Sequence, residues 1–430
     1  MGDNVKAVRN EAKDILSEMQ RLTIEGLASE ALENTKNSMD KMWRAVESLF
    51  RVILPKRDLK ITILFHSDLD GNGSAFCIAE MLDRIYSEYK EDGGNVMYYE
   101  LRRINYNYDI EKFADISDSD AIFVVDYSLS VKEHIEFLTE KTIGDIYWID
   151  HHQGSYDNII NNPDDHVAHK FMSMNRLFNV FYTKKGISGT LLCYNFARYC
   201  WNKMITAKSD SPCEGFLYEP VPAIIALTSF YDTFHPLSSK EFYYGINTVA
   251  YDVQEGNIPV WRDALVNTRV DKAGEYDTGC LCLDHTRYFT NAHSGRKTMY
   301  DIMKDGNLIL QYAVQENKKN VSAQMIELDL IFKGEHYSVA AINKMTNSFV
   351  FGDEYDKHDG VIVFYFNRYG TYTYSFFANE SGEHRLPCLE IATALGGGGH
   401  KFAAGATIKV NLLEACALNR ELNFDEILKK

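Results

Sequence analysis

Short continuous apolar runs alternate with amphipathic segments along the first half of the chain. The runs at residues 61–65, 96–101, 121–125 and 146–149 have the length and continuity of strands buried on both faces. Between them, the spacing of apolar residues predicts helices over 74–89 and 131–138. Strands that alternate with helices predict a parallel sheet whose two faces are covered.

The segment before the first strand has a helical pattern only. Over residues 5–53, apolar positions such as Val8, Ala12 and Ile15 recur at three- and four-residue spacing. We interpret it as a helical extension packed on the main domain, with a dimerisation or partner-binding helix as the alternative. The segment Pro55-Lys56-Arg57-Asp58 ends this pattern and marks a predicted boundary.

The rest of the chain is predicted to hold a linker and a second domain. We expect a long loop over 156–185, helices over 187–203 and 221–229, a mostly helical connection over 236–307 and a helix over 308–328. Strands follow at 337–342, 361–366 and 371–377, and Pro387 opens a helix that ends at Leu395 before the run Gly396–His400. The predicted parts are 1–57, 58–235, 236–330 and 331–430.

Acids and histidines gather where the apolar runs of the first half end. If the first strand continues through His66, Asp68 and Asp70, their side chains share one face. The other polar positions at the ends of apolar segments are Asp126, Asp150, His151, His152 and Asp232. Ends of parallel strands meet at one edge of the sheet, where closely spaced carboxylates repel one another unless a cation lies between them. Oxygen and nitrogen ligands without thiolates favour hard or borderline divalent ions, in sufficient number for two.

Composition and charge narrow the function. The formal net charge of −16 disfavours long duplex nucleic acid as a partner, whereas short phosphate compounds can bind through metal ions. No apolar run is long enough for a membrane span and no secretory pattern opens the chain, so we expect a cytoplasmic protein without a membrane partner. The scattered cysteines predict reduced thiols, and Cys280-Leu281-Cys282 lacks the spacing of a zinc site.

The order of these motifs resembles that of a known family. His66-x-Asp68-x-Asp70-Gly71, Val125-Asp126, Asp150-His151-His152 and Asp232 are similar to the motifs of the DHH phosphoesterase superfamily. The run Gly396–His400, followed by Ala403-Ala404-Gly405, resembles the DHH-associated C-terminal domain of oligoribonucleases, single-strand exonucleases and cyclic-dinucleotide phosphodiesterases. The resemblance implies an α/β fold, in which a helical linker joins a parallel-sheet DHH domain to a smaller α/β C-terminal domain behind an N-terminal helical extension.

The resemblance also assigns metal ligands. It implies two divalent ions, with Mn²⁺ preferred and Mg²⁺ or Co²⁺ as alternatives. One ion would be held by His66, Asp68 and Asp126, and the other by Asp70, Asp126, His151 and Asp232. Asp126 would bridge the ions, Asp150 would orient His151, and His152 would contact the scissile phosphate, so Asp126, Asp150 and His152 are the expected catalytic residues.

A second set of residues is expected to bind the substrate. Residues without a Cβ let backbone N–H groups approach a phosphate, so Gly397, Gly398 and Gly399 are candidates, and the resemblance adds His400, His152 and Ser188. Catalysis is expected in a cleft between the two domains. Members of this family carry an arginine on the last strand before the glycine helix, where this chain has Ser375–Asn379. Arg368 and Arg385 are the candidates to replace it.

We therefore predict a two-metal phosphodiesterase that hydrolyses short oligonucleotides or cyclic and linear dinucleotides to mononucleotides. The enzymatic alternatives are a 3′-phosphatase acting on adenosine 3′,5′-bisphosphate and a single-strand-specific exonuclease. The alternative outside the enzymes is a nucleotide-binding regulator. A homodimer is the oligomeric state that the resemblance favours.

Overall fold

The computed structural model describes residues 30–106, 110–129, 131–155, 159, 166–182, 187–206, 221–233, 235, 238–249, 251–266, 269–270, 276–277, 299–379, 381–413 and 421–428. The chain divides into two compact units. Unit 1 comprises Met1–His151 and Asn162–Asn307, and unit 2 comprises His152–Asn161 and Leu308–Lys430. The predicted boundaries at residues 57, 235 and 330 stay predictions.

Unit 1 is built on a five-stranded parallel sheet in the order β2-β1-β3-β4-β5. Its strands are β1 (Leu59–His66), β2 (Met97–Ile104), β3 (Ala121–Val125), β4 (Asp145–Asp150) and β5 (Leu177–Phe181). This confirms the predicted α/β fold with a parallel sheet. From β1 the chain crosses to β2 on one side and then to β3 on the other. Open parallel sheets bind ligands at the carboxyl ends of such diverging strands.

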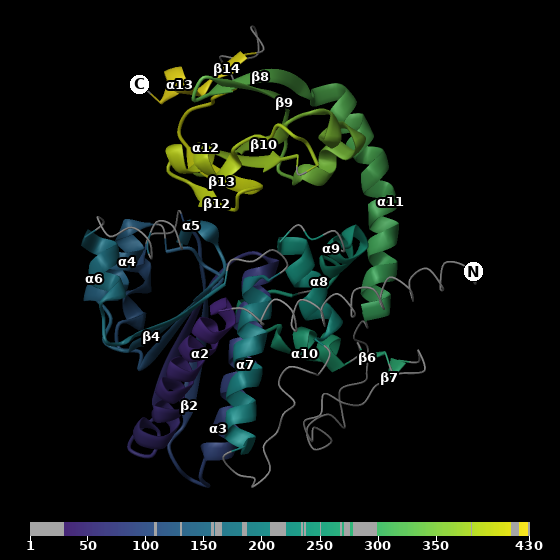
Figure 1. The fold of residues 1–430 in the computed structure, drawn as a ribbon. Coiled ribbons are helices and arrows are strands. Elements are labelled where there is room, and N and C mark those ends of the chain that lie inside the picture. The colour runs from purple at the N-terminus through teal and green to yellow at the C-terminus, as the bar shows by residue number, and fades with distance from the viewer. Residues whose placement is uncertain are drawn as a thin grey trace. The chain divides into compact units, whose positions relative to one another are not determined.

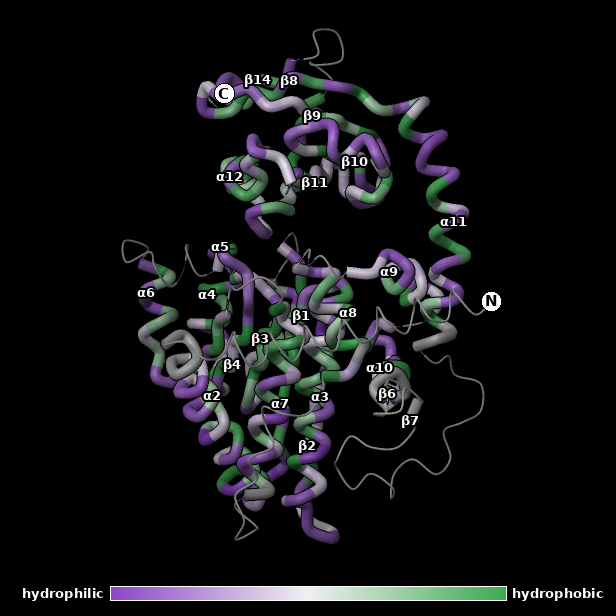
Figure 2. Tube along the Cα trace, turned by 45° about the vertical axis from the view of Figure 1, so that its right-hand side comes forward, coloured by the Kyte–Doolittle hydropathy of each residue, from purple (hydrophilic) through white to green (hydrophobic). Residues whose placement is uncertain are grey.

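Helices cover both faces of this sheet (Figure 1). On one face, alternate strand residues such as Ile63, Phe123 and Tyr147 share a core with α2 (Glu30–Ser48), α3 (Leu69–Tyr89) and α7 (Gly189–Thr206). On the other face lie α4 (Lys132–Glu140) and α6 (His166–Met172), and the rings of Trp148 and Phe171 have centroids 5.9 Å apart. Hydrophobic positions are concentrated along β3 and much of β1, as continuous apolar runs require (Figure 2).

The described part of the N-terminal extension packs on unit 1. Trp43 and Val46 of α2 and Phe50 of the helical turn η1 (Leu49–Ile53) are buried in the same core as the sheet. The helical pattern is thereby confirmed for residues 30–53, and residues 5–29 lie outside the described part of the chain.

Two predicted segments need correction. The long loop expected over 156–185 is wrong, because α6 and β5 lie within it and Val180 of β5 is buried. Polar residues on both sides conceal this five-residue edge strand. The helix expected to reach residue 328 ends at Gln324, and β8 (Ile326–Phe332) begins at once, with Leu328, Leu330 and Phe332 buried at the two-residue period of a strand.

The chain after α7 supplies further helices to unit 1. They are α8 (Ala223–Asp232), α9 (Lys240–Ile246), η5 (Val253–Glu255) and α10 (Ile258–Val266), with a short pair of strands, β6 (Arg269–Val270) and β7 (Tyr276–Asp277). The described part of the connection is thus mostly helical, as expected. The segment with Cys280 and Cys282 lies outside the described residues.

Unit 2 carries a seven-stranded sheet in the order β12-β13-β11-β10-β9-β8-β14. Its other strands are β9 (Glu335–Asn343), β10 (Gly360–Phe366), β11 (Tyr372–Ala378), β12 (Gly398–Gly399), β13 (Ala403–Ile408) and β14 (Glu421–Asn423). The helix α11 (Met299–Gln324) precedes the sheet, and α12 (Cys388–Ala394) and α13 (Phe424–Ile427) accompany it. Most pairs are antiparallel, with β9 parallel to β10 and β8 parallel to β14. Within the described residues, no helix combines the length and apolar character needed to cross a bilayer.

Candidate metal centre

Asp126 lies directly after β3 in an unusual backbone conformation. Its φ angle is 50°, in the left-handed region that residues with a side chain seldom adopt. Hydrogen bonds hold it there, because the Asp126 N–H donates to the Ile149 carbonyl (2.9 Å) and the Trp148 indole donates to the Tyr127 carbonyl (3.0 Å). Such strain persists where the surroundings enforce it, which is common at functional sites.

His66, Asp68 and Asp70 come together by a turn. They would share one face only if the strand continued through them, and it does not, because β1 ends at His66 and Asp68 caps α3 by accepting a hydrogen bond from the Gly71 N–H (2.9 Å). A Cβ on Gly71 would lie 2.0 Å from the His66 carbonyl oxygen, so this turn requires glycine. The turn places Asp68 Oδ2 2.7 Å from His66 Nδ1 and Asp70 in the first turn of α3.

The N-terminus of α7 holds Asp70. Its carboxylate accepts hydrogen bonds from the Ser188 hydroxyl (2.5 Å) and from the N–H groups of Gly189 (2.7 Å) and Thr190 (3.1 Å). The partial positive charge of a helix N-terminus stabilises a carboxylate at this position. Ser188 therefore supports Asp70, and the substrate contact expected of Ser188 stays a prediction.

His151 faces three carboxylates of unit 1. Its Nε2 atom lies 3.1 Å from Asp126 Oδ1, 3.3 Å from Asp232 Oδ2 and 3.5 Å from Asp70 Oδ2. Asp232 is the last residue of α8. Asp150 accepts a hydrogen bond from the His151 main-chain N–H (2.9 Å), so it acts on the backbone of His151.

Several carboxyl groups lie close together in this buried site. Burial, followed by the carboxylates of Asp70, Asp68 and Asp232, raises the pKa of Asp126 well above its ordinary value. Burial and the neighbouring carboxylates of Asp70, Asp68 and Asp150 raise the pKa of Asp232 likewise. Among the described residues, neither carboxylate oxygen of Asp126 accepts a hydrogen bond.

These residues fit divalent metal ions. The potential ligand atoms of His66, Asp68 and Asp126 lie within 4.8 Å of one another, and so do those of Asp70, Asp126 and His151. The two groups share Asp126. A buried carboxylate surrounded by like charges is stabilised by a cation, and oxygen and imidazole ligands without thiolates suit Mg²⁺ or Mn²⁺.

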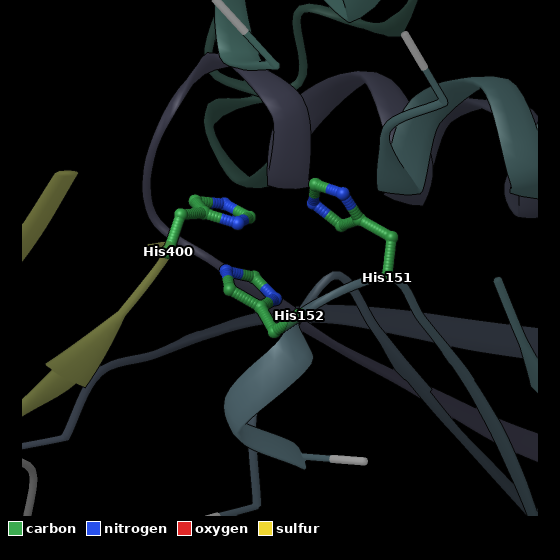
Figure 3. A group of neighbouring side chains, drawn as sticks. All are labelled: His151, His152 and His400. Atoms are coloured by element: carbon green, nitrogen blue, oxygen red, sulfur yellow. The ribbon is translucent and has the colours of Figure 1, made fainter. Parts of the chain in front are cut away.

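His152 lies beside His400 within unit 2. Figure 3 shows the two imidazoles face to face, and their ring centroids are 4.6 Å apart with planes inclined by 16°. Some backbone N–H groups of the run Gly396–His400 donate hydrogen bonds within unit 2. The N–H groups of Gly396 and Gly397 donate to carbonyls of α12, and that of His400 donates to the Ala403 carbonyl (2.7 Å).

Gly398 and Gly399 form β12, which pairs with β13. The two arginine candidates also contact aromatic rings of their own unit, Arg368 that of Tyr369 and Arg385 that of Phe402. The substrate contacts expected of these glycines and arginines stay predictions.

The sequence pattern did not identify some residues that surround the candidate ligands. The ring of Tyr106 lies 5.6 Å from that of His66 and stacks on Tyr127 at 5.0 Å. The amide of Asn105 donates to the Ser67 hydroxyl (2.7 Å), beside His66. Both residues directly follow β2, so the strand-end rule applied to that strand would have identified them.

Comparisons with known proteins agree with this architecture. Residues 60–211 match the model of the DHH family, N-terminal domain. No protein of curated function matches the sequence. A solved DHH-domain structure, described as a member of a family of ribosomal proteins, has 13% identity and a TM-score of 0.50, with 95% of this chain and 96% of the other covered. This likeness shows the fold alone.

Two further solved structures are similar at lower TM-scores. RecJ from Thermus thermophilus, in complex with Mn²⁺, has 12% identity and a TM-score of 0.43, over 90% of this chain and 56% of RecJ. The pGpG-specific phosphodiesterase PggH from Vibrio cholerae has 10% identity and a TM-score of 0.35, over 86% of this chain and 98% of PggH.

Proposed function

We propose that this chain, whose residues 60–211 match the DHH family N-terminal domain, is a two-metal phosphodiesterase that cleaves short nucleotide substrates to mononucleotides. The substrates are oligonucleotides of a few residues, or cyclic and linear dinucleotides. The observation that carries the proposal is Asp126, a buried carboxylate shared by two ligand groups whose other members come from β1, α3 and the end of β4.

The metal assignment follows these two groups. His66, Asp68 and Asp126 would hold one ion, and Asp70, Asp126, His151 and Asp232 the other, with Mn²⁺ as the proposed ion. Bound divalent ions supply a hydroxide nucleophile at neutral pH and polarise the phosphoryl oxygens. Asp126, in its enforced backbone conformation, presents one carboxylate to both groups.

The chain's own residues would perform the remaining tasks. Asp150 fixes the main chain of His151 and so sets the direction of that imidazole. His152 would donate a hydrogen bond to the phosphate as negative charge develops on it. His400, whose ring lies against His152, would contact the same phosphate, and Gly397, Gly398 and Gly399 would allow the substrate to approach the backbone closely.

Charge favours small substrates. With a net charge of −16, the chain lacks the overall positive field that drives binding of long nucleic acids. The shared ligand Asp126 also argues against a regulator that only binds nucleotides, because a sensor has no need of a complete pair of metal sites.

A hydrolysis panel tests the proposal. The purified chain is incubated with Mn²⁺ and, separately, with linear pApA, cyclic di-AMP, a single-stranded 20-mer and adenosine 3′,5′-bisphosphate, beside an Asp126→Asn variant. We expect cleavage of a dinucleotide at a rate at least about 10³-fold above that of the variant. Preference for the bisphosphate would identify a 3′-phosphatase, and preference for the 20-mer an exonuclease. Absence of cleavage in all four, or full activity of Asp126→Asn, would refute the proposal.

A further inference from the structure

Exposed apolar side chains gather at one end of the unit 2 sheet. Phe366 ends β10 and is 60% exposed, and Tyr369, 66% exposed, lies in the turn between β10 and β11. Met345 and Val410, 77% and 63% exposed, follow β9 and β13. Since β9, β10 and β13 run in the same direction and β11 runs opposite, all four residues leave the sheet at one end.

Basic side chains accompany them. Lys344 precedes Met345, Arg368 precedes Tyr369 and Lys409 precedes Val410. The seven residues together form what we call the aromatic–basic end of the sheet. Among the described residues, neither lysine takes part in an ion pair. The Arg368 guanidinium lies 4.9 Å from the centroid of the Tyr369 ring and donates to its hydroxyl (2.7 Å).

Acidic residues are absent from this half of the sheet. The segments 360–379 and 391–413, which contain β10, β11, β12 and β13, hold no aspartate or glutamate, although the chain has 61 acids in 430 residues. The opposite half of the same sheet carries Glu327, Asp329, Glu335 and Glu421. The local charge is therefore positive in a chain that is strongly acidic, which favours an anionic ligand.

The turn between β10 and β11 is held in one shape. The Asn367 side-chain oxygen accepts hydrogen bonds from the Tyr369 N–H (3.0 Å) and from the Thr371 hydroxyl (2.9 Å), and its amide donates to the Thr373 hydroxyl (3.2 Å). The ring of Phe366 lies 5.0 Å from that of Tyr372. Both exposed rings are thus displayed on a rigid support, which lowers the entropy lost when a ligand packs on them.

We propose that the aromatic–basic end binds single-stranded nucleic acid, with bases stacking on Phe366 and Tyr369 and phosphates contacting Arg368 and Lys409. Aromatic rings interleaved with cations are the surface that single strands prefer, because every base has a face that can stack. The inference rests on the proposed function, and among the substrates proposed there it favours single-stranded oligonucleotides over dinucleotides. A protein partner or a second copy of the chain is the competing occupant.

Equilibrium binding tests this without catalysis. A fluorescently labelled single-stranded 12-mer of adenylate is titrated with the full chain in EDTA, which prevents cleavage, and anisotropy gives the Kd. The double variant Phe366→Ser/Tyr369→Ser is expected to raise Kd about tenfold or more. Lys409→Ala is expected to remove about one phosphate contact, which would reduce the slope of log K against log salt concentration by about 1. Tyr98→Ser is the matched control, since Tyr98 is 58% exposed on β2 of unit 1.

The outcomes separate this inference from the proposed function. If the double variant, shown by its thermal unfolding to be folded, binds the 12-mer within about twofold of the wild type, or if Tyr98→Ser weakens binding equally, the inference is wrong whatever the hydrolysis panel gives. A wild-type dimer that dissociates in the double variant, with unchanged 12-mer binding, would identify a second copy as the occupant and overturn it. If the 12-mer binds and the double variant weakens this binding, but the chain cleaves none of the four substrates, the inference stands and the proposed hydrolase activity is refuted.

Discussion

The carboxylate of Asp126 packs against the backbone of Gly189, and no side chain fits between them. A Cβ built on Gly189 would lie 2.6 Å from both Cβ and Oδ1 of Asp126. The same glycine donates its N–H to Asp70. One residue at the start of α7 therefore borders the shared carboxylate and holds another carboxylate of the site.

Gly189→Ala is predicted to disrupt the metal centre. The added methyl group must displace Asp126, which its strained backbone and its hydrogen bond to Ile149 oppose. Misplacing a metal ligand or its support lowers metal affinity about 10- to 100-fold. We expect the Mn²⁺ concentration that gives half-maximal activity to rise by at least about tenfold, as measured by metal titration of dinucleotide hydrolysis.

Gly334→Ala is the control for this variant. Gly334 has a φ angle of 78° in the turn between β8 and β9, and no atom lies within 4 Å of a Cβ placed on it. The substitution should cost about 1–2 kcal/mol of stability through its backbone conformation and leave the Mn²⁺ dependence unchanged. Equal Mn²⁺ dependence in both variants would mean that Gly189 has no special relation to Asp126.

Much of the site could be predicted because it depends on strand ends. His66, Asp126 and Asp150 follow apolar runs that the structure confirms as neighbouring parallel strands, and the short length of these runs favours strands over helices. Whether the strand continues from His66 through Asp68 to Asp70 could not be decided from the apolar pattern. A helix begins there, because the Asp68 carboxylate accepts a hydrogen bond from the Gly71 N–H and so caps the first turn. A local hydrogen bond of this kind does not change the spacing of apolar residues, so the hydrophobic pattern cannot reveal it.

Contacts between distant segments could not be predicted. The hydrogen bond from the Ser188 hydroxyl to the Asp70 carboxylate joins residues that are 118 positions apart, and the sequence around either residue does not indicate that they meet. The edge strand β5 was missed because only Val180 in it is fully buried, so its period of two is weak. Sequence periodicity reports which face of an element is buried, and it does not report which side chains meet at the site.

Ser188→Ala is predicted to act through the metal. The substitution removes the hydroxyl that donates to Asp70 and leaves two backbone N–H donors in place. We expect the Mn²⁺ requirement to rise about tenfold while the KM for a dinucleotide at saturating Mn²⁺ stays the same. The control is Ser87→Ala on the exposed side of α3, whose hydroxyl donates to the Arg84 carbonyl. A raised KM with normal Mn²⁺ dependence would instead assign Ser188 to the substrate.

Asp126→Asn is predicted to stabilise the metal-free chain and to abolish its stabilisation by metal. The amide removes a buried carboxyl group whose charged form is disfavoured by burial and by Asp70, Asp68 and Asp232, so the metal-free variant should unfold at a higher temperature than the wild type. At a Mn²⁺ concentration of about 100 times its Kd, the wild type should gain about 2.7 kcal/mol, and the variant far less. Calorimetry with and without Mn²⁺ measures both effects.

Asp329→Asn is the control for the calorimetry. Asp329 lies on β8 of unit 2 and is partly exposed, and its Oδ2 atom lies 2.8 Å from His336 Nδ1. Its amide variant should respond to Mn²⁺ as the wild type does. If Asp126→Asn also gains the full stabilisation from Mn²⁺, the ion binds elsewhere and the assignment of the shared carboxylate fails.

The attachment of α2 to α7 is predicted to weaken in acid. Asp40 of α2 accepts hydrogen bonds from Tyr199 (2.7 Å) and Arg44 (2.5 Å) and lies 2.8 Å from Lys203 Nζ. Lys203 first, then Tyr199, lower the pKa of Asp40 from 3.8 to about 2. A lowered folded-state pKa gives stability that is present above about pH 4 and is lost as the pH falls towards 2. Since the side chain is partly solvated, Asp40→Asn should lower the free energy of unfolding by about 1 kcal/mol at pH 7. Urea unfolding from pH 7 to pH 3 should show the difference between wild type and variant narrowing below pH 4.

Asp92→Asn, in an exposed turn, is the control and should change the free energy of unfolding by less than about 0.5 kcal/mol at every pH. A cost of Asp40→Asn that does not depend on pH would contradict the ionic contribution.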